Sequence, residues 1–362
     1  MSTKAENLRM IRELSDAFGP SGFEDDVLEV IRKWSSDLGD IEEDHLRNLY
    51  IHRRGNTGGK PILMLDAHSD EVGFMIHSIK PNGTLRFVTI GGWSRNALAS
   101  ADVLVRNALG EYIPGIIAAK PVHFQTAAEK ASGGVPEISG FVIDVGATSA
   151  EDAVNNYHIR IGEPVVPATR CRIDEAHDVI FGKAFDCRIG VAALIETLRR
   201  LDGVELPVDV VGVFSSQEEV GERGCKASVR HAKPDIAFVF EGCPADDTFT
   251  EPYAIQTALK KGPMFRFMDV SVICSPRYQR FVLDLAERKH LPVQASVRED
   301  GGNDAAIING ALEFGTPVVV AGVPVRYIHS MNCITSYADF DSTVQVAVET
   351  VKALTPEIIR GF

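Results

Sequence analysis

Residues 211–221 read Val-Gly-Val-Phe-Ser-Ser-Gln-Glu-Glu-Val-Gly, an apolar run that ends in two adjacent acids, Glu218 and Glu219. The run has the composition of a buried strand, and an unpaired buried charge is strongly unfavourable. A metal ion beside the two carboxylates would remove this cost and would give the two acids different roles. The pattern therefore predicts a buried strand that ends at a metal site.

Other segments supply further donors of the same kind. A second apolar run, Leu-Met-Leu-Asp-Ala-His-Ser-Asp, ends with His68 and Asp70, while Asp186 and His329 lie much later in the chain. Two-metal hydrolysis needs a bridging carboxylate, further ligands for each ion and a base for the attacking water. Imidazole and carboxylate donors suit zinc, cobalt or manganese. The sequence supplies this set only by combining distant segments, and it favours a metal-dependent hydrolase.

The bulk composition restricts the class of protein. The 362 residues suffice for one large domain or two ordinary ones, and a formal net charge of −13 argues against non-specific binding to nucleic acid or to anionic membranes. The chain contains no apolar stretch as long as a membrane-spanning helix, and its first residues lack the apolar core of a signal peptide. Six cysteines without a C-x-x-C pair are typical of reduced thiols. We therefore expect a cytoplasmic protein.

The sequence changes character twice. Helical spacing predicts helices over 4–17 and 24–38, and Ser21 in the turn between them is a candidate cap for the second helix. Short alternating runs broken by turn signals fill residues 72–166, which is typical of a small β-barrel or sandwich. Alternating strand and helix patterns follow from about residue 170.

These patterns predict an α/β catalytic domain built from residues 1–71 and 167–362. An all-β, barrel-like domain of residues 72–166 is inserted into it. The candidate acids and histidines lie at strand ends or in the loops that follow. Open α/β sheets collect their ligands at such places.

Each candidate alone has a structural alternative. Asp186 precedes a predicted helix and could cap it. Glu218 and Glu219 could pair with Arg223 and Lys226 on a loop. The joint occurrence of all the motifs in one chain argues for the site instead.

The motifs follow one another in a distinctive order. The order is His-x-Asp-Glu-Val-Gly, Phe-Asp-x-Arg-x-Gly, Glu-Glu-Val-Gly, a further acid, and Arg-Tyr-Ile-His-Ser. It closely resembles the M42 family of metallo-aminopeptidases, which includes the tetrahedral (TET) and glutamyl aminopeptidases and some proteins labelled endoglucanases. Residues 18–24, Phe-Gly-Pro-Ser-Gly-Phe-Glu, and 91–93, Gly-Gly-Trp, resemble the family as well. The resemblance covers nearly the whole chain and implies an α/β/α zinc-peptidase-like domain with an inserted β domain.

The resemblance also implies roles for individual residues. Two divalent ions, zinc or cobalt with manganese as an alternative, would be held by five ligands. These ligands are His68, Asp186, Glu219, Glu241 and His329, with Asp186 bridging the two ions. Glu218 would be the general base for the attacking water, and Asp70 would hydrogen-bond the His68 imidazole and fix its tautomer. Family members form tetrahedral dodecamers with interior active sites, which implies self-association and short peptide substrates.

The chain departs from the family pattern at the ligand Glu241. The family usually has Asp there, and the extra methylene of Glu could change the spacing of the metals. Asp246 and Asp247 are rival ligands close by. Three cysteines near the presumed site could ligate zinc or fill small buried positions. They are Cys187, Cys243 and Cys333.

Three other features are weaker candidates. Residues 301–305, Gly-Gly-Asn-Asp-Ala, lack the lysine of a phosphate loop, and their resemblance to a Gly-Thr-Asp-Ala segment of the family implies a substrate-side loop. Arg326 could meet a substrate carboxylate or brace the site. His123 lies in the inserted segment, which family members use for oligomer contacts and substrate access.

The sequence favours an aminopeptidase that removes N-terminal residues from short peptides. A metal-dependent deacylase of N-acyl amino acids is the main alternative, and Glu241 in place of Asp favours it. An endoglucanase needs an aromatic-lined cleft, and a chain with two tryptophans offers little support for one. An inactive scaffold is the remaining alternative, and metal content would test it.

Overall fold

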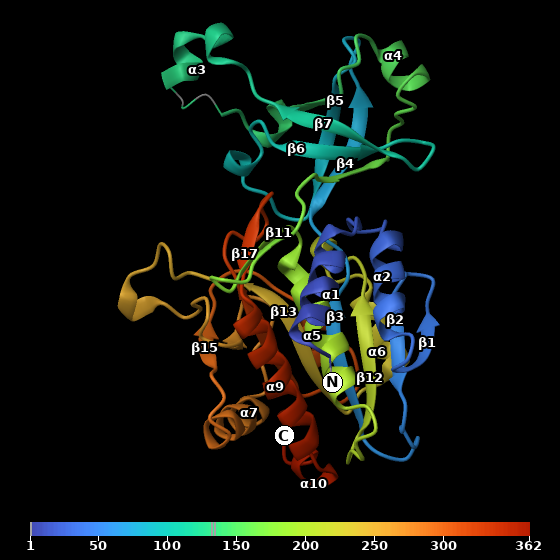
Figure 1. The fold of residues 1–362 in the computed structure, drawn as a ribbon, viewed down its shortest axis with the longest axis vertical. Coiled ribbons are helices and arrows are strands. Elements are labelled where there is room, and N and C mark those ends of the chain that lie inside the picture. The colour runs from blue at the N-terminus through green and yellow to red at the C-terminus, as the bar shows by residue number, and fades with distance from the viewer. Residues whose placement is uncertain (1, 132, 134) are drawn as a thin grey trace.

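The computed structural model describes residues 2–131, 133 and 135–362. These residues form a mixed eight-stranded sheet, a three-stranded sheet and a closed barrel of six strands (Figure 1). The fold therefore confirms the predicted α/β class with an added β-barrel. Among the described residues, none of the helices is long and apolar enough to cross a membrane.

The eight-stranded sheet has mixed pairing. Its strands, in spatial order, are β1 (Gly39–Glu43), β2 (Leu49–Arg53), β12 (Asp209–Ser215), β3 (Ile62–His68), β13 (Ile236–Pro244), β16 (Val318–Val325), β14 (Met264–Met268) and β15 (Gln294–Val297). The central strands β12, β3, β13 and β16 pair in parallel, and nearly all their residues are buried. Parallel strands of this kind are covered on both faces and read as continuous apolar runs. Their carboxyl ends therefore meet at one edge of the sheet.

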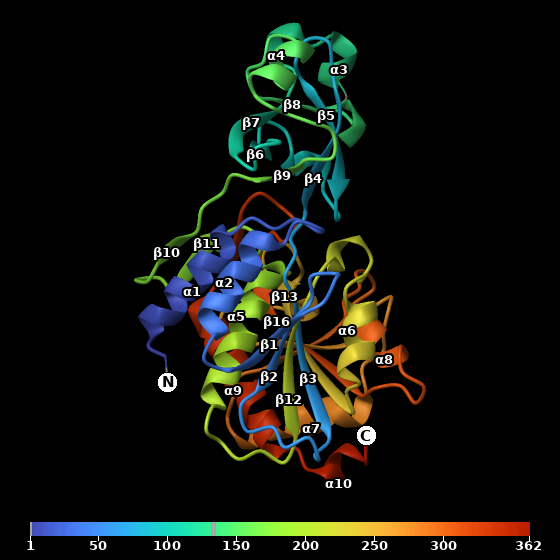
Figure 2. The same cartoon turned by 90° about the vertical axis from the view of Figure 1, so that its right-hand side faces the viewer.

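Helices cover both faces of this sheet (Figure 2). One face packs against α1 (Lys4–Asp16), α2 (Asp25–Ser35), α5 (Phe185–Arg200), α7 (Pro276–Arg288) and α9 (Tyr337–Ala353). The other face packs against α6 (Cys225–Ala232) and α8 (Ala305–Gly310). The helices predicted over 4–17 and 24–38 correspond to α1 and α2.

The barrel stands on the side of the sheet where β3 ends (Figure 1). It closes in the order β4 (Gly73–Ile79), β5 (Leu85–Ile90), β8 (Val142–Asp144), β7 (Tyr112–Ala118), β6 (Asp102–Arg106) and β9 (Pro164–Pro167). Its core includes Phe74, Phe87 and Phe141. Two short helices, α3 (Ala127–Ala131) and α4 (Ala150–Asn155), belong to the same segment. We propose residues 72–166 as the inserted domain, because all six barrel strands fall within or next to this range.

The three-stranded sheet joins distant parts of the chain. It consists of β10 (Arg172–Asp174), β11 (Val179–Gly182) and β17 (Cys333–Thr335), all antiparallel. β11 leads directly into α5, and β17 follows the segment that carries His329. This sheet therefore brings Asp186 and His329 near each other.

One detail of the sequence-based prediction is wrong. The residue that caps α2 is Glu24, and its side chain makes no capping hydrogen bond. Ser21 instead donates its hydroxyl to Asp70 Oδ2 at 2.6 Å. Ser21 bonds to Asp70 instead of capping the helix because the Asp70 carboxylate is buried and needs hydrogen-bond donors.

Candidate metal centre

The candidate residues meet at the carboxyl ends of the four parallel strands. His68 is the last residue of β3, and Glu241 lies near the end of β13. Glu218 and Glu219 follow β12 in a short 3₁₀ helix, η4 (Glu218–Val220), and His329 follows β16. Ligands of open α/β sheets collect at this edge, as the sequence predicted.

Asp186 enters the centre from the start of α5. Its Oδ1 lies 3.0 Å from His68 Nε2, and its Oδ2 lies 3.2 Å from His329 Nε2. The N-cap position of α5 is Ala184, and both Asp186 carboxylate oxygens face imidazoles, so the described residues show no capping by the Asp186 side chain. Gly242 lets the start of α5 approach β13, because a Cβ there would lie 2.2 Å from the Phe185 carbonyl oxygen. The Asp186 carboxylate therefore contacts the imidazoles of both His68 and His329, one with each oxygen.

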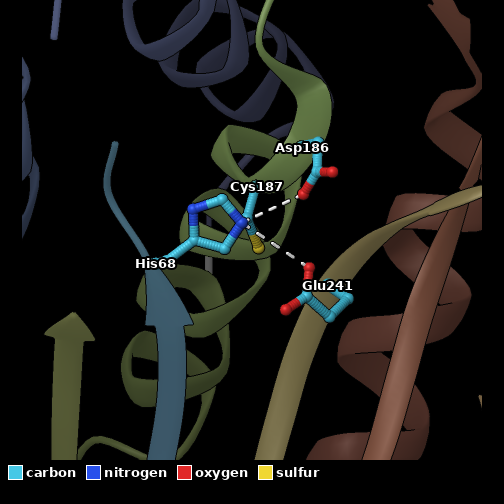
Figure 3. Close-up of side chains that lie close together, drawn as sticks. All are labelled: His68, Asp186, Cys187 and Glu241. Atoms are coloured by element: carbon cyan, nitrogen blue, oxygen red, sulfur yellow. Dashed lines mark hydrogen bonds and ion pairs between the residues drawn. The ribbon is translucent and has the colours of Figure 1, made fainter. Parts of the chain in front are cut away.

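The first group of donors is His68, Asp186 and Glu241, with Cys187 beside them (Figure 3). Glu241 Oε2 lies 3.8 Å from His68 Nε2. The Cys187 thiol donates to the Phe240 carbonyl at 3.2 Å, and burial raises its pKa well above the usual value. Cys187 is therefore a protonated, buried thiol.

The other two cysteines near the centre have the same character. Burial raises the pKa of Cys243 and of Cys333 to about 12. Both thiols are buried. Cys243 and Cys333 belong to none of the donor groups among the described residues, whereas Cys187 lies within ligand distance of His68, Asp186 and Glu241.

The second group of donors is Asp186, Glu219 and His329. His329 Nε2 lies 3.4 Å from Glu219 Oε2. The other ring nitrogen, Nδ1, lies 3.0 Å from the Gly92 carbonyl oxygen, so Nδ1 carries a hydrogen and donates it to this carbonyl. Nε2 then faces Asp186 and Glu219. Gly92 follows β5 of the barrel, so the barrel segment orients a residue of the sheet domain.

Asp70 holds the loop that carries the two glutamates. Its Oδ1 accepts the Glu218 N–H at 2.9 Å, and its Oδ2 accepts the Glu219 N–H at 3.2 Å. Asp70 Oδ1 also lies 3.4 Å from His68 Nδ1. Burial opposes ionisation of Asp70, but this interaction with His68 helps to hold the Asp70 pKa below its usual value. Asp70 therefore contacts both the His68 ring and the backbone of the loop.

Glu24 supports the same loop from the N-cap position of α2. Its Oε1 accepts the Gly22 N–H at 2.8 Å and the Gln217 N–H at 3.2 Å. Gln217 has a positive φ of 54°, which is uncommon for a residue with a side chain. Two buried carboxylates, Glu24 and Asp70, thus hold three consecutive backbone amides.

The pKa values of the three glutamates at the centre are raised, because the residues are buried close to other acids. Burial raises the pKa of Glu218 to about 8; the His68 charge opposes this shift, and the nearby acids Asp186 and Asp70 add to it. Burial likewise raises the pKa of Glu219 and of Glu241 well above the usual value. A group of carboxyls that resist ionisation together would ionise readily beside cations.

The pKa values of the two imidazoles are also raised, which favours their charged form. Burial opposes the charged form of His68, yet the surrounding acids raise its pKa well above the usual value. Burial also opposes the charge on His329, but Asp186 and Glu219 raise its pKa to about 10. Asp186 keeps a pKa below its usual value, because His329 and His68 outweigh its burial. The Asp186 carboxylate is therefore ionised.

The residues fit a pair of divalent ions. Glu219 Oε1 is buried and has no hydrogen-bond partner in the part of the chain that the structure describes. The two donor groups share only Asp186, so each could hold one ion with the carboxylate between them. Nitrogen and oxygen donors in this number suit zinc, cobalt or manganese.

A cavity of about 520 Å³ opens onto the centre. Asp186, Glu218, Glu219, Glu241 and His329 all contribute to its lining. Other parts of the lining come from Arg266, Arg298, Glu222, Gly301 and Gly302. Residues 301 and 302 therefore lie where a substrate-side loop would be.

The remaining candidates have other partners. Arg326 forms a bidentate ion pair with Asp247, with contacts of 2.9 and 2.6 Å. Asp246 accepts the Thr257 N–H at 3.0 Å and pairs with Arg298 at 3.2 Å. Arg326 is thus held by Asp247 and has a structural contact of its own. Neither Asp246 nor Asp247 belongs to a donor group among the described residues.

Two further candidates lie apart from the centre. His123 is exposed in the 3₁₀ helix Val122–Phe124 and does not contribute to the lining of the cavity. Lys226 donates to the Gly221 carbonyl at 2.8 Å. No ion pair joins Lys226 or Arg223 to Glu218 or Glu219 among the described residues, so the loop-pairing alternative does not hold.

The fold and the centre together define a hydrolase of the metal-dependent peptidase class. The sequence model of the M42 glutamyl aminopeptidases matches residues 47–346. The glutamyl aminopeptidase of Lactococcus lactis subsp. cremoris is 32% identical over 334 residues, which cover 91% of each chain. The chain belongs to the M42 family of metal-dependent aminopeptidases and is a peptide hydrolase.

Solved structures agree with this assignment. The TET aminopeptidase of a marine sediment archaeon of the Thaumarchaeota superposes with a TM-score of 0.93 at 34% identity, over 98% of this chain and 99% of that chain. The TET1 peptidase of Pyrococcus horikoshii superposes with a TM-score of 0.85 at 28% identity, over 96% of this chain and 100% of that chain. That peptidase can assemble into a tetrahedron or a large octahedral shell.

Proposed function

We propose that this chain is a co-catalytic, two-metal aminopeptidase that removes N-terminal residues from short peptides. The observation that carries the proposal is the position of Asp186, whose two carboxylate oxygens face His68 and His329. A shared carboxylate between two donor groups is what a two-metal centre requires. His68, Asp186 and Glu241 would hold one ion, and Asp186, Glu219 and His329 the other.

Bound divalent ions would polarise the scissile carbonyl and lower the pKa of water to about 7. The chain's own residues supply the rest of the chemistry. Glu218 lines the cavity, lies 3.9 Å from His68 Nε2 and belongs to no donor group with Asp186. Glu218 also lies within ligand distance of His68 and Glu219. With those two residues assigned to the two ions, the Glu218 carboxylate is left to accept a proton from the attacking water and to pass it to the leaving amine.

Asp70 is the positioning residue for this base. Its carboxylate accepts the backbone N–H of both Glu218 and Glu219, which fixes how the two side chains diverge. One glutamate then points toward His329, and the other remains available to the substrate. Adjacent acids can thus have separate roles.

We also propose that the chain self-associates, as a dodecamer, in the cytoplasm. The TET1 peptidase of Pyrococcus horikoshii assembles into closed shells, and it covers nearly the whole of this chain at 28% identity. Six free and buried cysteines are typical of a reducing compartment. Light scattering of the purified protein would test the assembly.

The test of the function is hydrolysis of aminoacyl-p-nitroanilides by metal-stripped protein reloaded with Zn²⁺, Co²⁺ or Mn²⁺. We expect metal-dependent release from substrates with a free amine. N-acetylated versions of the same substrates should remain intact. Turnover confined to the acetylated substrates would replace the aminopeptidase with a deacylase, and an absence of metal and turnover would indicate a scaffold.

A further inference from the structure

A second cluster of metal-ligating side chains lies on the surface, apart from the cavity described above. It consists of Glu42 from β1, His52 from β2 and His231 from α6. The two imidazoles contact the same carboxylate oxygen, because His231 Nε2 lies 3.1 Å and His52 Nε2 lies 3.4 Å from Glu42 Oε2. None of the three residues lines the cavity of the catalytic centre.

The two distances from the imidazoles to Glu42 Oε2 match those between ligands of a tetrahedral ion, and the donor atoms of all three residues lie within 4.8 Å of one another. Zinc binds imidazole nitrogen and carboxylate oxygen at about 2.0–2.2 Å, so two ligands of a tetrahedral ion lie about 3.3 Å apart. The contacts of 3.1 and 3.4 Å fall on either side of this value. In the catalytic centre, the matching contacts of His68 and His329 with Asp186 are 3.0 and 3.2 Å.

The fold holds the three donors in place. Glu42 and His52 lie on the antiparallel strands β1 and β2, where Glu42 pairs with Tyr50 in the register. The His231 ring packs edge-on against the buried Tyr50 ring, with the centroids 4.8 Å apart. The Tyr50 hydroxyl is itself held by Asp44 at 2.7 Å. Donors on strands and a helix are more precisely placed than donors on loops.

We propose that Glu42, His52 and His231 form a third metal site, which binds a divalent transition ion such as Zn²⁺, Co²⁺ or Ni²⁺. Two imidazoles and one carboxylate supply three ligands, and the exposed position leaves at least one further coordination position to solvent. The ion would link the edge strand β1 and its neighbour β2 to the last turn of α6. Because α6 begins just after the loop that carries Glu218 and Glu219, this link would stabilise the element behind the catalytic loop.

The experiment compares the full-length protein with the double variant His52→Asn and His231→Asn. Both proteins are stripped of metal and titrated with Co²⁺, and bound metal is measured together with the visible absorption of the ion. We expect the double variant to bind one ion fewer per chain than the wild type, to lose the corresponding absorption, and to retain its peptidase activity. Addition of Zn²⁺ should also raise the melting temperature of the wild type more than that of the variant.

The matched control is His177→Asn. His177 forms an ordinary exposed pair with Asp174 at 2.8 Å, and it belongs to none of the donor groups found among the described residues. This control should bind as many ions as the wild type. Equal metal binding by the wild type and the double variant would overturn the proposal, and so would an equal loss in the control. The single variant His231→Asn serves the same test if the double variant does not fold.

Discussion

The Asp70 carboxylate accepts the backbone N–H of Glu218 at 2.9 Å, so a buried acid just after β3 holds the proposed base, which follows β12. Asp70 also accepts the Glu219 N–H and the Ser21 hydroxyl. Asp70 therefore supports the loop that carries Glu218 and Glu219 in addition to its contact with His68.

Replacing Asp70 with Asn should lower kcat about 10- to 100-fold, which is the usual effect of losing a supporting group at a metal site. An amide offers one acceptor oxygen in place of two, and its NH₂ group would face a backbone donor. Steady-state kinetics and metal content measure the effect. Ser21→Ala is the control, because it removes one donor and leaves both backbone contacts. Full activity of Asp70→Asn would show that the loop of Glu218 and Glu219 keeps its conformation without the Asp70 carboxylate.

Replacing Glu241 with Gln should remove one ion per chain, because a neutral amide is a poor ligand for a divalent ion. Glu241 shares a donor group with His68 and Asp186. Metal analysis after dialysis against dilute Zn²⁺ measures the loss. Glu222→Gln is the matched control, since Glu222 lines the same cavity but belongs to no donor group. Equal metal content in both variants would remove Glu241 from the ligand set.

Replacing Arg188 with Met should destabilise the protein by about 1–3 kcal/mol, because buried backbone carbonyls lose their donor while Glu71 keeps its ion pair with Lys183. Arg188 is buried and donates to the carbonyls of Ser69, Leu14 and Gly19. It also lies 3.5 Å from Glu71. Denaturant unfolding measures the loss, and Arg360→Met, at an exposed pair, should leave the unfolding free energy unchanged. A stable Arg188→Met protein would mean that water replaces these contacts.

The metal-free protein should lose stability as the pH rises from about 5 to 8. The pKa of Glu218 is raised from 4.5 to about 8 in the folded state. A raised pKa gives stability that is fully present below 4.5 and is lost as the pH rises through 8. Bound cations would cancel this loss by favouring the ionised carboxyls, so the metal-loaded protein should melt at a more constant temperature.

Melting curves with and without metal at several pH values measure the difference. The gap between the two melting temperatures should widen with pH. Glu218→Gln should reduce the slope of the metal-free protein. Parallel curves for the loaded and metal-free protein would contradict the assignment of the acids to the metal centre.

The sequence predicted the α/β class and the barrel. It also singled out the candidate site residues, which the structure brings together, because most of these motifs end a buried strand or begin a helix. Donors such as His68 and Glu219 are recognisable by residue type and by their place after apolar runs. The contact between Gly92 and His329 was not predictable, since a backbone carbonyl has no signature in the sequence. The contact between Ser21 and Asp70 was also missed, because a local capping rule favoured Ser21 as a cap and the partners lie 49 residues apart.

Glu218→Gln tests the central claim most directly, because it removes a base and leaves the size of the side chain unchanged. Activity on an aminoacyl-p-nitroanilide and metal content are measured on the same samples. We expect the variant to keep the metal content of the wild type and to lose about 10²- to 10⁴-fold in kcat, which is the range for a general base. A variant with bound metal and undiminished turnover would contradict the role of Glu218.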